Sequence, residues 1–112
     1  MDIYCDSSLK ENCIVIEGQE PDVKAYKKEV TNNVGEYKAV IRALELALTS
    51  GYEQAQILTD SKLVADQLNR LAKVKTEHLK PFHKLASGLL KKAKATIKWI
   101  PREKNLAGKV LG

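Results

Sequence analysis

Residues 31–48 read TNNVGEYKAVIRALELAL, and this stretch decides the predicted fold. It opens on three polar residues, Thr31 to Asn33, which are typical of the start of a helix. Apolar residues then recur at the spacing of one helical face, namely Tyr37, Val40, Ile41, Leu44, Ala47 and Leu48. Gly51 is expected to end the helix. The stretch therefore predicts one long amphipathic helix that must pack against a sheet.

The sequence on both sides supplies the partners of this helix. Before it, alternating and β-branched residues predict strands over 2–7, 12–18 and 22–30. After it, we expect a buried strand over 55–59, a helix that starts at Asp60-Ser61, a helix over 77–93, a strand over 95–100 and at most the start of a final helix.

Connection lengths turn this order into a topology. Short turns between the first three strands favour an antiparallel meander, and strand–helix–strand units give parallel neighbours by right-handed crossover. We therefore predict an α/β fold with a five-stranded mixed sheet, three antiparallel strands followed by two parallel ones, flanked by helices. The 112 residues are enough for one domain spanning 1–112.

Three acidic residues meet at one end of this sheet. Asp6 lies at the carboxyl end of the first strand, and Asp60 at that of the fourth. The long helix begins at the same end, which places Glu36 there as well. Ligands of open α/β sheets bind beyond the carboxyl ends of parallel strands.

Each acid also has a purely structural interpretation. Glu36 follows Asn33 by three residues, as in a capping box, and Asp60 has the position of an N-cap. Asp6 could be a turn residue. These interpretations account for each acid singly, but three independent caps have no reason to converge.

Converging carboxylates repel one another unless a cation holds them together, and clustered hard oxygens suit a pair of Mg²⁺ or Mn²⁺ ions. The net charge of +5 favours a polyanionic partner. Together these features predict phosphodiester hydrolysis in a nucleic acid. The chain lacks a GxxxxGK[ST] loop, an apolar run of membrane-spanning length and a visible signal peptide, so we expect a cytoplasmic, non-membrane protein and not an NTPase. Cys5 and Cys13 are interpreted as buried thiols on neighbouring strands.

Four segments in this order, IYCDSS, TNNVGEYKAVIRALELA, ILTDSKLVADQLN and IKWIPREKN, resemble type 1 ribonuclease H, especially its small prokaryotic members. The resemblance covers nearly the whole chain. It implies the ribonuclease H fold and endonucleolytic cleavage of the RNA strand of RNA–DNA hybrids by a monomer, with double-stranded RNA as a further candidate substrate. By motif match, Asp6, Glu36 and Asp60 correspond to three of the family's four catalytic, metal-binding carboxylates. Expected substrate contacts are Ser7, Thr31, Asn32, Asn33, Asn69 and Arg102, of which Thr31 and Asn33 match positions that contact the hybrid.

Several positions depart from the family pattern. Ser7 stands where glycine usually follows the first aspartate, and Gly108 stands where the fourth carboxylate is expected. The catalytic-loop histidine has no counterpart, and Arg102 or Glu103 could occupy its space. The large basic protrusion of some members is absent, and the final helix is expected to be truncated at Gly112. These departures leave two rivals to an active nuclease, which are an impaired module that binds hybrid or duplex and a basic scaffold for protein partners.

Overall fold

The computed structural model describes all residues, 1–112. Its strands are β1 (Asp2–Ser7), β2 (Glu11–Val15), β3 (Asp22–Ala25), β4 (Gln56–Thr59) and β5 (Thr96–Trp99). Its helices are α1 (Asn32–Thr49), α2 (Lys62–Leu68), α3 (Lys80–Ala93) and α4 (Leu106–Leu111), with 3₁₀ turns at Glu77–Leu79 and Arg102–Lys104. No helix has the length and hydropathy required to cross a bilayer.

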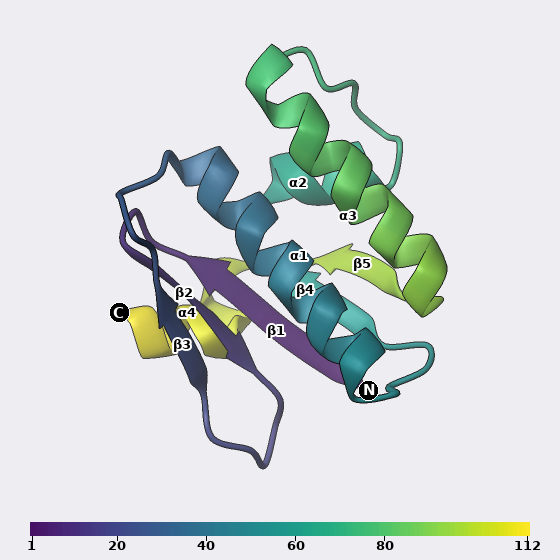
Figure 1. Cartoon of the computed structure of the whole chain (residues 1–112). Coiled ribbons are helices and arrows are strands. Elements are labelled where there is room, and N and C mark those ends of the chain that lie inside the picture. The colour runs from purple at the N-terminus through teal and green to yellow at the C-terminus, as the bar shows by residue number, and fades with distance from the viewer.

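The sheet has the predicted mixed topology, in the order β3-β2-β1-β4-β5. Its β3-β2-β1 pairs are antiparallel, and its β1-β4 and β4-β5 pairs are parallel. Helices α1 and α3 pack together over one face, and α4 lies against β1 and β2 on the other (Figure 1). The sheet is therefore covered on both faces, and the main core lies between the sheet and α1.

The two cysteines show how the strands divide between these faces. Cys5 belongs to the core under α1, whereas Cys13 packs with Ala107 of α4 on the opposite face. Both thiols are buried and free, as predicted. Alternation along a strand places Asp6 on the face opposite to Cys5, which is the face of α4.

The third strand is shorter than the predicted 22–30. Its last ladder partner is Glu11, the first residue of β2, which pairs with Ala25. Beyond Ala25 no strand remains to pair with, so the chain turns over the β1–β2 connection, where Tyr26 N donates to Lys10 O and Val30 N donates to Leu9 O. Sequence alternation alone could not show where the neighbouring strand ends.

The ends of α1 and α3 follow local chemistry. After α1, Gly51 has a φ of +68°, and the N–H groups of Gly51 and Tyr52 return to the carbonyls of Leu48 and Ala47. This is a Schellman ending, so glycine stops the helix as predicted. The helix predicted over 77–93 is α-helical only from Lys80, because Pro81 favours the first helical turn and a 3₁₀ turn precedes it.

A glycine allows α1 to approach β1 closely. A Cβ at Gly35 would lie 2.4 Å from Ser7 Oγ and 3.2 Å from both Ser7 Cβ and Val30 Cγ2. Ser7, where the family usually has glycine, is therefore accommodated because residue 35 has no side chain. A side chain at residue 35 would therefore compete with the Ser7 side chain for the same space.

We expect Gly35→Ala to destabilise the protein by about 1–3 kcal/mol through overpacking. In a Ser7→Gly background the same change should cost far less, since the hydroxymethyl group is gone and alanine is the better helix former. Urea unfolding of the parent, both single variants and the double variant gives the coupling energy, expected at about 1–3 kcal/mol. Additive effects would show that the two positions do not compete for space.

Candidate metal centre

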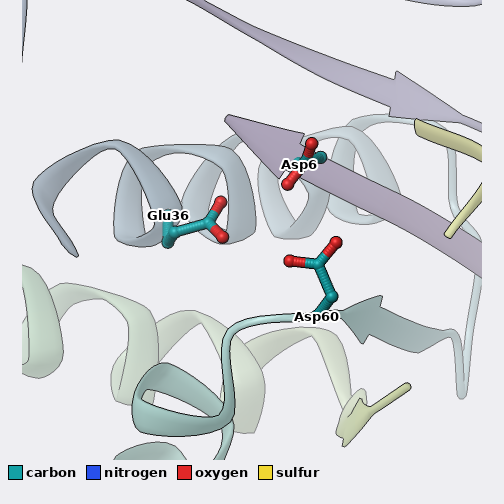
Figure 2. Close-up of side chains that lie close together, drawn as sticks. All are labelled: Asp6, Glu36 and Asp60. Carbon is teal, nitrogen blue, oxygen red and sulfur yellow. The ribbon is translucent and has the colours of Figure 1, made fainter. Parts of the chain in front are cut away.

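The three acids converge as predicted. Asp6 comes from the end of β1, Glu36 from α1, and Asp60 from the connection between β4 and α2, and their carboxylates point toward one another (Figure 2). One oxygen from each lies within 4.8 Å of the other two. Such a spacing of hard oxygen atoms can surround a divalent cation.

Neither helix uses these acids as caps. Thr31 is the N-cap of α1 and accepts a hydrogen bond from Val34 N, and Ser61 is the N-cap of α2 and accepts from Val64 N. Asp6 lies within β1, paired with Cys13, and is not a turn residue. The structural interpretations of all three acids are therefore wrong, and the carboxylates remain available to a ligand.

In the metal-free site, burial and mutual repulsion disfavour the ionised forms of Asp6 and Glu36. Burial, followed by the charge of Asp6, raises the pKa of Glu36 to about 8. Burial, followed by the charge of Asp60, raises the pKa of Asp6 to about 6. The backbone N–H of Ser7 and the guanidinium of Arg102 lower both pKa values in part.

The Glu36 carboxylate also lacks a hydrogen-bond partner for one of its oxygens. Its Oε1 atom is buried and has no hydrogen-bond partner within the protein. An unsatisfied buried acceptor is costly, and a cation between the carboxylates would satisfy it. The donor set, the spacing and this orphaned oxygen all fit Mg²⁺ or Mn²⁺.

Asn105 fixes the orientation of Asp60, a role that we did not predict from the sequence. It is fully buried, and its Nδ2 donates both to Cys5 O (3.0 Å) and to Asp60 Oδ2 (3.1 Å). Its Oδ1 caps α4 by accepting from Ala107 N. The available signal was its place in the Asn-x-Ala segment three residues before Gly108. On the other side, Trp99 Nε1 donates to the Asp60 carbonyl (3.1 Å).

Gly108 lies beside the acids. A Cβ at this position would be 3.3 Å from Asp6 Oδ2 and 3.6 Å from Asp60 Oδ2. A side chain at residue 108 would therefore project into the site. A carboxylate at this position would lie beside Asp6 and Asp60.

An open cleft of about 870 Å³ surrounds the acids, which is far more room than a cation needs. Among the expected substrate contacts, Ser7, Asn32, Asn33 and Arg102 line it, as do Glu103 and Gly108. Thr31 is the exposed cap at the edge of α1. Asn69 lies outside the cleft lining, at the far end of α2, where its Nδ2 donates to Ile97 O.

We expect the metal-free protein to lose stability as pH rises from 4.5 to about 8. In this range the unfolded chain releases the Glu36 proton while the folded protein retains it, so stability is highest below pH 4.5 and the contribution is lost above pH 8. Glu36→Gln should make this slope shallower, leaving the part due to Asp6, whose pKa is raised to about 6, and should be more stable than the parent at high pH by on the order of 2 kcal/mol. Urea unfolding in the presence of a chelator, monitored by the fluorescence of Trp99, measures this difference in the free energy of unfolding. Parallel pH profiles for the two proteins would contradict the raised pKa.

Known proteins share this architecture. The reverse transcriptase-like family model matches residues 13–111. A bifunctional protein of Mycobacterium tuberculosis is 37% identical over 76 residues, which are 67% of this chain and 21% of that protein. The chain thus corresponds to about a fifth of that relative.

Solved structures agree with the family match. RNase H1 from the archaeon Halobacterium salinarum superposes with a TM-score of 0.84 at 24% identity, covering 98% of this chain and 92% of that one, which shows a common fold. LC11-RNase H1, solved in complex with an RNA/DNA hybrid, has a TM-score of 0.79 at 26% identity and 99% coverage of both chains. On this evidence the chain belongs to the reverse transcriptase-like family and has the fold of type 1 ribonuclease H.

Proposed function

We propose that this protein is a metal-dependent endonuclease that hydrolyses the RNA strand of RNA–DNA hybrids. The observation that carries the proposal is the convergence of Asp6, Glu36 and Asp60 within 4.8 Å at the base of a wide cleft. The family match supports the reaction class, and a similar protein has been solved in complex with an RNA/DNA hybrid.

The three carboxylates would hold Mg²⁺ or Mn²⁺, which supplies an activated water and stabilises the leaving oxygen. The chain itself orients these ligands. Asn105 holds Asp60 by donating to the Oδ2 atom of the carboxylate, so Asp60 could still offer a ligand oxygen to a cation. Polar side chains line the cleft rather than an aromatic stack, as expected for contacts to sugar, 2′-hydroxyl and phosphate groups. Arg102 brings a positive charge to the same cleft, and double-stranded RNA remains a second candidate substrate.

Cleavage of a labelled hybrid with Mg²⁺ or Mn²⁺ tests the proposal. We expect Asp6→Asn to reduce the rate by at least about 100-fold, equivalent to ~2.7 kcal/mol of transition-state stabilisation. Asp66→Asn is the matched control, because Asp66 pairs with Lys62 on α2 and does not line the cleft. Cleavage by Asp6→Asn at the parent rate would refute the three-acid site.

A second candidate function, a binding module with impaired catalysis, is favoured by one observation, the glycine at position 108. Hybrid binding is therefore measured beside cleavage. If the parent binds hybrid without cleaving it, the module is the better description. If the parent neither binds nor cleaves hybrid, a basic scaffold for protein partners is the better description.

Restoring the fourth carboxylate separates these alternatives further. Gly108→Asp places an acid where a Cβ would face Asp6 and Asp60. We expect turnover to rise by roughly ten-fold or more, about 1.4 kcal/mol, with hybrid affinity little changed and the parent more active with Mn²⁺ than with Mg²⁺. Without metal, the added charge should lower the melting temperature. Gly108→Asn, similar in size but neutral, is the control and should show no gain. A parent that is fully active, with no gain in the Gly108→Asp variant, would show that the fourth carboxylate is dispensable.

A further inference from the structure

Tyr26 links the two elements that carry Asp6 and Glu36. It lies just beyond β3, half-buried, and its hydroxyl is 2.7 Å from Ser7 Oγ, 3.2 Å from Asn12 Nδ2 and 3.3 Å from Gly35 O. A phenol can donate one hydrogen bond and accept two. All three contacts form together when Ser7 and Asn12 donate to Tyr26 and Tyr26 donates to Gly35 O. In that arrangement Ser7 gives up its alternative bond to Ser8 O, which lies 2.7 Å from the same Oγ, because a hydroxyl has only one proton to donate.

The two outer partners are immediate neighbours of the site carboxylates. Ser7 follows Asp6 on β1, and Gly35 precedes Glu36 on α1. One hydroxyl thus joins the end of β1 to the beginning of α1, at the point where Gly35 allows the closest approach between them. The junction therefore lies between the two backbone segments that carry Asp6 and Glu36.

The third partner is itself held rigidly. Asn12 is buried, and its Oδ1 accepts a hydrogen bond from Arg42 Nε at 2.7 Å. Arg42 also pairs with Asp22 at 3.0 Å. Since Arg42 can only donate, it fixes the Asn12 amide with its nitrogen toward Tyr26. The Tyr26 hydroxyl is therefore anchored from β2 and α1 as well as from its own segment.

Asp6 and Glu36 repel each other, and Glu36 Oε1 is buried without a partner, so the backbone must hold the two side chains together before any cation arrives. We propose that Tyr26 is a positioning residue for the metal centre: its hydroxyl sets the spacing between β1 and α1 at which Asp6 and Glu36 bind a divalent cation. The inference rests on the proposed function only in requiring that the three carboxylates bind such a cation.

Mn²⁺ titration of the metal-free protein, with free Mn²⁺ followed by electron paramagnetic resonance, tests the proposal without requiring turnover. Tyr26→Phe should weaken Mn²⁺ binding by roughly ten-fold, at the lower end of what loss of a group bonded directly to a ligand costs, because Tyr26 acts through the neighbours of Asp6 and Glu36. Tyr52→Phe removes the same hydroxyl from a half-buried tyrosine beyond the opposite end of α1, and should change affinity by less than about two-fold. Urea unfolding establishes that both variants are folded under the titration conditions.

Ser7→Ala is a second variant that keeps the Tyr26 ring and removes only one of its contacts. It should weaken Mn²⁺ binding in the same direction but by less than Tyr26→Phe. Where the parent cleaves hybrid, excess Mn²⁺ should restore the kcat of Tyr26→Phe while KM for the hybrid stays near the parent value, because the defect lies in cation affinity.

The outcomes distinguish this inference from the function on which it rests. Parent-like Mn²⁺ affinity in Tyr26→Phe, or an equal loss in Tyr52→Phe, overturns the role of Tyr26 and leaves the proposed function standing. If Tyr26→Phe does not fold, parent-like affinity in Ser7→Ala overturns it instead. A parent that binds no Mn²⁺ overturns both. A loss confined to Tyr26→Phe and Ser7→Ala supports it.

Discussion

The parallel pairing of β1 with β4 is the constraint on which the rest of the site depends. Their register pairs Tyr4 with Leu58, and the same offset brings Asp6 level with Asp60 at the ends of the strands. Both side chains then project toward the face covered by α4. A slip of one residue would turn one of the two carboxylates to the other face. Hydrophobic packing enforces the register, because Ile3 and Ile57 are fully buried under α1.

Without a cation, this geometry disfavours the charged forms of the carboxylates. Burial disfavours the charged carboxylates, and their proximity adds repulsion, which is why the pKa values of Asp6 and Glu36 are raised. The fold offsets part of the cost with polar contacts, through Asn105 on Asp60 and through the positive charge of Arg102. A bound divalent ion would offset the remaining cost, which would be larger with a fourth acid in place of Gly108. The fold thus places carboxylates with raised pKa values at one end of the sheet, as expected of a functional site.

The helix ends near the site are capped by polar residues other than the three acids. Thr31, Ser61 and Asn105 cap the three helices that border the site, so no carboxylate is used on a helix end. Because Gly35 has no side chain, α1 can approach β1 closely at Ser7. The Tyr26 hydroxyl lies at this contact, within hydrogen-bond distance of Ser7 Oγ and Gly35 O. Two departures from the family pattern therefore have different consequences. Ser7 is accommodated because residue 35 has no side chain, whereas Gly108 adds no carboxylate to the three-acid cluster.

The sequence by itself determined the order of elements, the mixed sheet and the end of the sheet at which Asp6, Glu36 and Asp60 meet. These follow from apolar periodicity, connection length and crossover handedness, which act along the chain. Tertiary structure decided the rest. The third strand ends where its partner β2 begins, and the capping roles went to Thr31 and Ser61 rather than to Asn33 and Asp60. Asn105 and Tyr26 gained their roles only from partners distant in sequence, such as Asp60 and Ser7. Hydrogen bonds between segments far apart in the chain depend on side-chain positions that no local pattern encodes, so only the folded molecule could reveal them.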